Sequence, residues 1–367
     1  MKIGILGAGQ LGRMLALAGY PLGLEFTFLD PAEEACAAPL GEHIRADYLD
    51  QAALAQFCAG IDLATYEFEN VPQQAADFVA ARVPLLPGPQ ALSAGQDRLG
   101  EKQLFVTLGI PVPEFAAVSS RAGLEAAVRH TGLPAVLKTR RMGYDGKGQF
   151  VLRSAADLDA AWAALGAQPL ILEAFVPFKR EVSCLAVRGR DGAIRYYPLV
   201  ENVHRSGILR TARPRAHDPL QALGEDYARR VLERLDYVGV LAFEFFVVGD
   251  GAQAGLLANE IAPRVHNSGH WSIEGAEVSQ FENHLRAIAG LPLGSTALRG
   301  ESLMLNFIGS APDTPLLAQH EGLHIHLYGK TPKPQRKIGH ATLTAADSTT
   351  LEQRLRRLEP LLDDADA

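Results

Sequence analysis

Two glutamates in the second half of the chain have the spacing expected of a metal site. Glu244 lies inside the apolar run Gly239–Phe246, where a carboxylate is costly to bury unless it is paired or holds a cation. Glu260 follows the turn-forming segment Gly249–Gly255, and a hairpin symmetric about Ala252 would oppose the two acids directly, roughly 5 Å apart. Such a pair repels unless a cation separates it, and Mg²⁺ binds one or two carboxylates together with substrate phosphates. The pair therefore predicts a metal–phosphate site.

Cationic and amide side chains follow closely behind the second acid. Arg264, His266 and Asn267 all lie within the segment Asn259–Gly269. If the hairpin forms, these three side chains would face an anion beside the metal. The sequence thus predicts an anion site next to the cation site.

Three further segments have residue types suited to a nucleotide. Lys138 precedes the glycine loop Gly143–Gly148, which suits a phosphate clamp, although an ordinary hairpin with a solvated lysine explains the same residues. Glu173–Pro177, followed by Glu181, suits either a hinge that contacts adenine and ribose or an acidic edge strand. The cationic loop Lys330–Lys337 is held open by prolines and would clamp a substrate phosphate, or it is a solvated turn. Taken one at a time, these segments are not specific.

The first glycine motif, Gly7–Gly12, matches G-x-G-x-x-G between a predicted strand and a predicted helix, and Asp30 closes the next strand. This context favours a dinucleotide fingerprint, but the same glycines also serve a tight strand-to-helix turn. Gln10 and Arg13 add polar groups that an NAD turn does not need, and the helix N-terminus offers N–H groups to an anion. We therefore favour binding of a small substrate here.

The segment Thr65–Pro72 ends the third predicted strand with two acids and an amide. Ligands bind at the carboxyl ends of parallel strands, so this segment is a second candidate for substrate contact. We predict that Glu69 contacts the ligand. For Asn70, capping of the following helix is an equally good explanation.

The elements that would position these residues follow from the apolar periodicity. In the first hundred residues we predict strands at Ile3–Leu6, Phe26–Leu29 and Leu63–Tyr66, and helices at Met14–Ala18 and Ala52–Cys58. This alternation is typical of a parallel α/β sheet. Three prolines within Pro84–Pro89 predict a domain boundary.

A second unit is predicted beyond that boundary. Its elements are a helix at Gln96–Leu108, strands at Ala135–Lys138, Gln149–Leu152 and Leu170–Glu173, and a helix around Ala155–Leu165. Frequent turns in Glu181–Phe246 predict antiparallel sheet with one helix at Ala222–Leu235. The last part has predicted strands near Leu303–Ile308 and His324–Leu327, then an amphipathic helix at Thr349–Leu362.

Composition narrows the class of protein. With 367 residues, of which 47% are hydrophobic, the chain can bury cores of two or three domains. A net charge of −7 argues against a nucleic-acid-binding protein. Cys36, Cys58 and Cys184 show no metal-ligand spacing, and no apolar run reaches the length of a membrane span. We expect a soluble, cytoplasmic protein with no membrane partner.

Several motifs together resemble the N5-carboxyaminoimidazole ribonucleotide synthase family of ATP-grasp enzymes. They are Gly7–Met14, Tyr66–Pro72, Asp97-Arg98, Gly143–Gly148, His204–Thr211 and Asn259–Trp271, and the similarity continues to Lys330–His340. The resemblance implies a Rossmann-like N-terminal substrate domain (1–97), a central ATP-grasp fold (98–295) and a small β-rich C-terminal domain (296–367). It also implies a homodimer that uses ATP and Mg²⁺ to join bicarbonate to 5-aminoimidazole ribonucleotide, through carboxyphosphate.

The resemblance also implies roles for individual residues. The implied ATP contacts are Arg98, Lys138, Gly143, Tyr144, Asp145, Gly146, Lys147, Gly148, Gln149, Glu173, Ala174, Phe175, Val176, Glu181, His204, Asn259 and Glu260. The implied aminoimidazole ribonucleotide contacts are Gln10, Leu11, Glu69, Asp145, Lys147, Lys330, Arg336 and Lys337. Glu244 and Glu260 would hold Mg²⁺, while Arg264, His266 and Asn267 would be the catalytic residues around bicarbonate. Met142 departs from the pattern, because many family members have glycine there.

Three other functions deserve comparison. A formate-dependent glycinamide ribonucleotide transformylase would share the phosphate site, but Gln10 and the run His266–Trp271 argue against it. An NAD-dependent oxidoreductase would explain the first glycine motif but gives no role to the Glu244/Glu260 pair. A non-catalytic nucleotide-binding regulator would not need to retain that pair together with Arg264.

Overall fold

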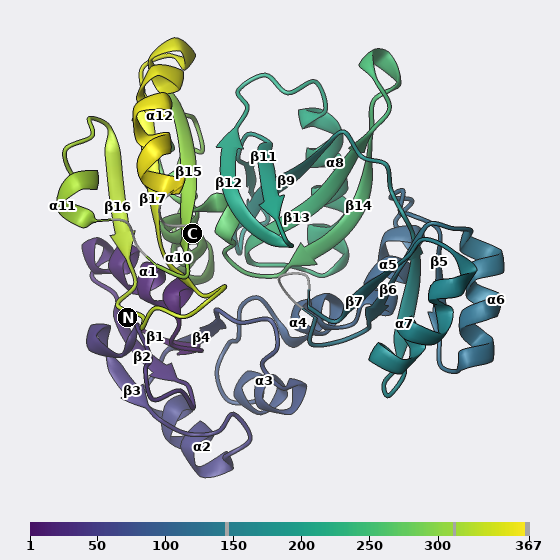
Figure 1. Cartoon of the computed structure of the whole chain (residues 1–367). Coiled ribbons are helices and arrows are strands. Elements are labelled where there is room, and N and C mark those ends of the chain that lie inside the picture. Colours follow the sequence, from purple (N-terminus) through teal and green to yellow (C-terminus); the bar gives the residue numbers. More distant parts are fainter. Residues whose placement is uncertain (144–146, 311–312, 364–367) are drawn as a thin grey trace.

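The computed structural model describes residues 1–143, 147–310 and 313–363, which form three sheets (Figure 1). The N-terminal sheet is parallel, in the order β3-β2-β1-β4. Its strands are β1 (Lys2–Leu6), β2 (Glu25–Leu29), β3 (Glu42–Ile44) and β4 (Leu63–Tyr66). The accompanying helices are α1 (Gln10–Gly19), α2 (Gln51–Ala59), α3 (Gln73–Ala80) and α4 (Pro89–Gln96). The predicted parallel α/β arrangement is confirmed.

The second sheet is antiparallel, in the order β5-β8-β6-β7. Its strands are β5 (Phe115–Val118), β6 (Ala135–Thr139), β7 (Gln149–Leu152) and β8 (Leu170–Ala174), with helices α5 (Arg98–Thr107), α6 (Arg121–Thr131) and α7 (Leu158–Leu165). The predicted helix Gln96–Leu108 is wrong at its start. Asp97 has extended backbone angles, ends α4, and accepts a hydrogen bond from the Leu99 amide as the N-cap of α5.

The largest sheet is antiparallel and contains nine of the described strands, in the order β14-β13-β9-β11-β12-β15-β17-β16, with β10 paired to β9. The strands are β9 (Arg180–Arg188), β10 (Ile194–Tyr196), β11 (Val200–Arg205), β12 (Ile208–Pro214), β13 (Gly239–Val248), β14 (Gly255–Ala262), β15 (Glu301–Ile308), β16 (Leu323–Leu327) and β17 (Lys337–Ala345). Its helices are α8 (Gln221–Arg234), α9 (Ser272–Gly275), α10 (Gln280–Ala289), α11 (Thr314–Leu317) and α12 (Ser348–Asp363). Strand β17, which lies between β15 and the edge strand β16, has no counterpart in the prediction.

Helix α10 joins the N-terminal sheet to the largest sheet. Phe281 and Leu285 of α10 pack in one apolar core with Leu15 of α1, Phe26 of β2 and Val240 of β13. This shared core holds the carboxyl edge of the parallel sheet against the β13–β14 hairpin. Figure 1 shows the three sheets arranged around a central region toward which β14 and β4 end and from which β13 starts.

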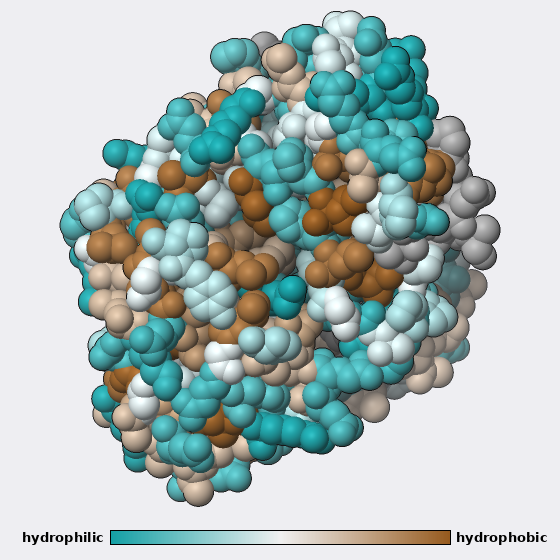
Figure 2. Space-filling model, turned by 90° about the vertical axis from the view of Figure 1, so that its left-hand side faces the viewer, coloured by the Kyte–Doolittle hydropathy of each residue, from teal (hydrophilic) through white to brown (hydrophobic). Residues whose placement is uncertain are grey.

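The outer face beside α1, α11 and β16 carries apolar surface. Figure 2 shows hydrophobic side chains gathered near the middle of this face, between hydrophilic margins.

Within the described ranges, no helix combines the length and the apolar character that a membrane crossing requires.

Candidate functional site

The three sheets meet around a cavity of about 570 Å³. Its lining includes the predicted site residues Gln10, Leu11, Glu69, Arg98, Lys138, Gln149, Glu181, His204, Glu244, Asn259, Glu260, Arg264, His266, Asn267 and Lys337. These residues come from seven strands, from helices α1 and α5 and from loops, so tertiary folding brings them together. A smaller cavity of about 130 Å³ lies alongside and is lined by Gly143 and Met142.

Glu244 of β13 and Glu260 of β14 are directly opposed, as predicted. The predicted symmetry about Ala252 is wrong nearer the turn, where Val248 pairs with Gly255, and the register shifts by one residue before Glu244. Burial and the neighbouring Glu260 carboxylate raise the pKa of Glu244. Burial would also raise the pKa of Glu260, but Arg98 outweighs it and lowers that pKa, donating a hydrogen bond of 2.7 Å to Oε2. One acid is thus held ionised and the other favours a proton, which is the behaviour expected of two like charges held close together.

The donor set fits a hard divalent cation. Among the residues that the structure describes, no three or more His, Cys, Asp or Glu side chains gather as a metal-binding group. Two opposed carboxylates suffice for Mg²⁺, which fills its remaining positions with water and phosphate oxygens. The pair therefore suits an ion that arrives with a phosphate ligand better than a permanently caged structural metal.

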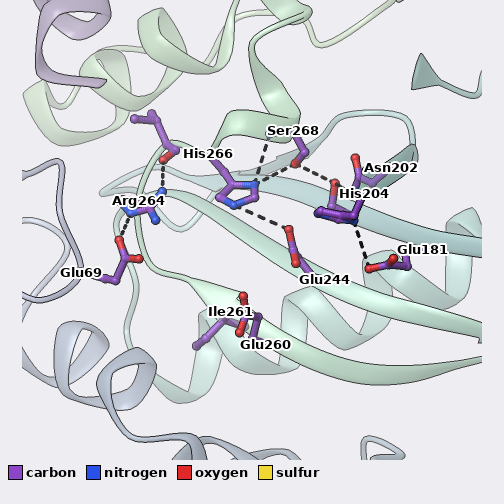
Figure 3. Close-up of polar contacts among 12 residues, drawn as sticks. Glu69, Glu181, Asn202, His204, Glu244, Glu260, Ile261, Arg264, His266 and Ser268 are labelled. Carbon is purple, nitrogen blue, oxygen red and sulfur yellow. Dashed lines mark hydrogen bonds and ion pairs between the residues drawn. The ribbon is translucent and has the colours of Figure 1, made fainter. Parts of the chain in front are cut away.

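A chain of polar contacts runs beside this acid pair (Figure 3). His266 Nε2 lies 3.6 Å from Glu244 Oε1, while its Nδ1 accepts a hydrogen bond from the Ser268 amide at 3.3 Å. That bond makes Nε2 the protonated nitrogen, and it faces Glu244. Burial, together with Arg264 and Lys337, holds the pKa of His266 well below its usual range. His266 is therefore a neutral hydrogen-bond donor here.

Arg264 forms an ion pair with Glu69 across the domain boundary. Burial would raise the pKa of Glu69, but the Arg264 guanidinium outweighs it and lowers that pKa to about 2. The predicted catalytic arginine and a predicted substrate residue are thus in direct contact (Figure 3). Any two molecules bound by them would also be close neighbours.

The opposite end of the cavity is lined by a histidine–glutamate contact and a pair of stacked aromatic rings. His204 Nδ1 lies 3.2 Å from Glu181 Oε2, and Phe178 stacks on Phe246 with ring centroids 5.0 Å apart. Burial would lower the pKa of His204, but its contact with Glu181 prevails and raises it. Both phenylalanines line the cavity, yet the sequence analysis missed them, because single phenylalanines in apolar segments give no functional signal.

Lys138 and Glu173 form a buried ion pair behind the cavity wall. Lys138 Nζ donates to Glu173 Oε2 at 2.9 Å, and Lys102 Nζ lies 3.7 Å from the same oxygen. Burial would raise the pKa of Glu173, but Lys102 and Lys138 outweigh it and lower that pKa to about 2. Lys102 was not predicted, because its burial is visible only in the fold.

The glycine turn Gly7–Gly12 is occupied by the protein's own carboxylate. Glu67 accepts hydrogen bonds from the amides of Gly9 at 2.7 Å and Gly12 at 2.9 Å. Asp30 is likewise engaged, by the Ala8 amide at 2.8 Å. Both the pyrophosphate position and the acid that a dinucleotide site needs are therefore filled, which disfavours the dinucleotide alternative. Glu67 is one of the two acids noted in Thr65–Pro72, but its structural role in the glycine turn was not predicted.

The predicted phosphate loop reaches the N-terminal sheet. Lys330 donates to the side-chain carbonyl of Gln10, and Arg336 Nη1 lies 3.7 Å from Glu34 Oε2. Some predicted residues lie outside the cavity lining: Lys147, Gly148, Glu173, Ala174, Phe175, Val176, Lys330 and Arg336. Tyr144, Asp145 and Gly146 fall outside the described residues.

Three domain families match this chain: a ribonucleotide synthetase preATP-grasp domain over residues 1–96, an ATP-grasp domain over 103–281, and a phosphoribosylaminoimidazole carboxylase C-terminal domain over 302–354. The chain is 61% identical to the N5-carboxyaminoimidazole ribonucleotide synthase of Pseudomonas aeruginosa, an alignment that covers 99% of this chain and 100% of that protein.

Two solved structures are similar over almost the whole chain. The N5-carboxyaminoimidazole ribonucleotide synthetase of Thermus thermophilus superposes with a TM-score of 0.93 at 56% identity and covers 98% of both chains. The N5-carboxyaminoimidazole synthase of Aspergillus clavatus, solved with ADP and 5-aminoimidazole ribonucleotide, superposes with a TM-score of 0.90 at 33% identity. That match covers 99% of this chain and 98% of the other.

Proposed function

The chain belongs to the N5-carboxyaminoimidazole ribonucleotide synthase family of ATP-grasp ligases, and from this premise we propose how its own residues perform the reaction. It catalyses the ATP-dependent carboxylation of 5-aminoimidazole ribonucleotide to N5-carboxyaminoimidazole ribonucleotide, a step of purine biosynthesis. The carbon source, the metal and the role of each residue are the proposed parts.

We place ATP along the cavity from Phe178 to the acid pair. Phe178 and Phe246 offer an aromatic surface to adenine, while Glu181 accepts from the ribose hydroxyls. Lys138 and Arg98 supply positive charge toward the phosphates. Mg²⁺ at Glu244 and Glu260 would neutralise phosphate charge, as phosphoryl transfer requires.

Bicarbonate is the proposed carbon source, bound beside Arg264. Arg264 orients one bicarbonate oxygen toward the γ-phosphorus, and the attack yields carboxyphosphate and ADP. His266, held neutral, donates a hydrogen bond without adding charge, and Asn267 offers its amide. The exocyclic amine of the ribonucleotide then attacks the carboxyl carbon and displaces phosphate.

The ribonucleotide is proposed to lie on the N-terminal side of the same cavity. Gln10, Leu11 and Glu69 line that side, and Lys330, Arg336 and Lys337 supply positive charge for its phosphate. The contact between Glu69 and Arg264 carries the proposal, because it brings the amine to the position where the carboxyl donor forms. Proximity of this kind shortens the path of a reactive intermediate that water would destroy.

Release of ADP tests the proposal directly. ADP formation should require 5-aminoimidazole ribonucleotide, bicarbonate and Mg²⁺ together, and the carboxylated product should appear in equal amount. Dependence on formate and glycinamide ribonucleotide in place of those substrates would overturn it.

The remaining proposals concern organisation. We propose the domains 1–97, 98–295 and 296–367, a cytoplasmic enzyme and a homodimer without nucleic-acid or membrane partners. Cys36, Cys58 and Cys184 are all free thiols, which suits a reducing compartment. The apolar groups on the face in Figure 2 are the kind of surface that a second copy covers. Light scattering of the purified protein measures the oligomeric state.

A further inference from the structure

The strand that carries Glu260 contains an extra residue at the site. Near the turn, β13 and β14 pair in a constant register, from Val248 opposite Gly255 to Phe245 opposite Ala258. Continued unchanged, this register would place Glu244 opposite Asn259. The register instead shifts by one residue, so that Glu244 faces Glu260. Asn259 is therefore the extra residue of a β-bulge, and the bulge creates the opposition of the two acids.

The bulge also explains an unusual side-chain arrangement. Consecutive residues of a regular strand point to opposite faces of the sheet. Asn259 and Glu260 are consecutive, yet both line the large cavity. A regular β14 would turn one of them away from the site.

Two residues of α5 hold the backbone on either side of Glu260. Glu101 Oε1 accepts a hydrogen bond from the Ile261 amide at 2.7 Å, and Lys102 Nζ donates to the Asn259 carbonyl at 2.5 Å. Lys102 also donates to the Ala258 carbonyl at 3.2 Å. These backbone groups point toward α5 and away from the neighbouring strand, and a buried backbone group without a partner would be costly.

Both α5 side chains are buried, at 2% exposure for Glu101 and 1% for Lys102. A simpler explanation is that Lys102 merely balances the charge of Glu173. That contact is long, however, at 3.7 Å, whereas both carbonyl contacts are short, and Glu173 already has Lys138 at 2.9 Å. The distances favour the strand as the main partner of Lys102.

We propose that Glu101 and Lys102 are positioning residues that clamp the β-bulge at Asn259 and thereby hold Glu260 opposite Glu244 for Mg²⁺–ATP. The inference rests on the proposed role of Glu260 as a metal ligand. Without the clamp, β14 would relax toward the unshifted register and turn Glu260 out of position. Gln10, Leu11 and the loop Lys330–Lys337, which are proposed to contact the ribonucleotide, belong to other elements than this strand.

A matched pair of substitutions at Glu101 tests the clamp. Glu101→Gln keeps a carbonyl oxygen for the Ile261 amide, whereas Glu101→Leu removes the acceptor at similar size. In Glu101→Leu we expect the dissociation constant of Mg²⁺, measured by calorimetry on enzyme saturated with ADP, to rise roughly 10-fold, and the Mg²⁺ concentration for half-maximal rate to rise with it. Effects of this size are typical of residues that position metal ligands. Glu101→Gln should stay within about 2-fold of the parent, and the KM for the ribonucleotide should stay unchanged in both.

Lys102→Met removes the second contact and should shift the Mg²⁺ dependence in the same direction. This variant also leaves Glu173 with one cation fewer, so its thermal unfolding is measured first; if it does not fold, the Glu101 pair decides. The clamp is refuted if folded Glu101→Leu keeps the parent Mg²⁺ dependence, or if Glu101→Gln loses it equally.

Glu260→Gln distinguishes a failure of the metal assignment from a failure of the clamp. If Glu260→Gln turns over normally, the metal assignment itself fails. If it is inactive while Glu101→Leu and Lys102→Met keep normal Mg²⁺ dependence, the metal assignment stands and only the clamp fails.

Discussion

The glycine turn at the start of the chain and the β13–β14 hairpin both place glutamates in buried surroundings, with opposite outcomes. Glu67 uses its carboxylate oxygens on the amides of Gly9 and Gly12, so that turn is closed by the protein itself. Glu244 and Glu260 face each other across a cavity. The recognisable dinucleotide motif is thus closed by the protein itself, whereas the acid pair faces a cavity, with Arg98 as the ion-pair partner of Glu260. Whether a buried acid serves structure or chemistry depends on how its lone pairs are already used.

The largest effect is expected at the open pair. Glu244→Gln and Glu260→Gln each keep size and shape but remove the charge that would attract Mg²⁺. We expect ATP cleavage to fall by about 10³-fold, comparable to removing a main electrostatic contact from a transition state. ADP release at saturating substrates measures the loss.

Thermal stability provides the control for these variants. Glu244→Gln relieves repulsion between two carboxylates, so its melting temperature should stay the same or rise. Glu260→Gln also removes the ion pair with Arg98 and should melt at a lower temperature than Glu244→Gln. Normal turnover of these variants at ordinary Mg²⁺ concentrations would contradict the proposed difference between the glycine turn and the β13–β14 hairpin.

Substitutions of Glu67, which closes the glycine turn, should lower the stability of the protein and leave the KM for ATP unchanged. Glu67→Ala leaves two buried amides without acceptors, and we expect a loss of about 2–5 kcal/mol in the free energy of unfolding. Glu67→Gln should lose less, because its carbonyl still accepts one bond. Denaturant unfolding measures the loss. The KM for ATP should not change in a folded variant, and a large rise without destabilisation would mean that this turn does bind the nucleotide.

The pH dependence distinguishes the same two regions. Burial raises the pKa of Glu67, and burial with the nearby Glu260 raises that of Glu244. A raised pKa means that the folded state binds the proton more tightly, so the stabilisation is present at low pH and lost as pH rises through the folded pKa. The metal-free enzyme should therefore lose stability as the pH rises above the ordinary pKa of a glutamate.

Mg²⁺ should restore only the part of that loss due to Glu244. Because the ion must displace the Glu244 proton, its apparent affinity should increase with pH across the same window, by up to about 10-fold per pH unit for one proton, and then level off. Calorimetry in buffers of different ionisation enthalpy measures the released proton. An affinity that is flat across this window would assign the proton elsewhere.

Sequence reasoning succeeded where local pattern determines structure. The parallel N-terminal strands follow from alternating apolar runs, and the β13–β14 hairpin follows from the turn between its strands, although the register at Glu244 and Glu260 is set by the bulge. The bulge at Asn259 was not predictable, because it depends on contacts from α5, more than 150 positions away in the chain. The role of Glu67 was not predictable for the same reason, because its partner amides belong to another loop and only the fold brings them together.

The smallest effect is expected at Met142, where many family members have glycine. Met142 has a φ of +62°, a left-handed conformation that glycine adopts without strain, and its side chain is 67% exposed. Met142→Gly relieves that strain but gives the unfolded chain more freedom, so the two effects nearly cancel, within about 1 kcal/mol. Melting temperature and the KM for ATP should both stay close to the parent values.

Met142→Val provides the sharper control, because a β-branched residue tolerates the left-handed region poorly. It should destabilise the protein by about 1 kcal/mol or more, since the strain rises while the exposed position offers no packing in return. If valine is tolerated as well as glycine, the backbone here adapts to its side chain. The absence of glycine at position 142 would then have no structural consequence. As at the turn Gly7–Gly12, the spacing of glycines would indicate the family, and the geometry of the loop would determine what it binds.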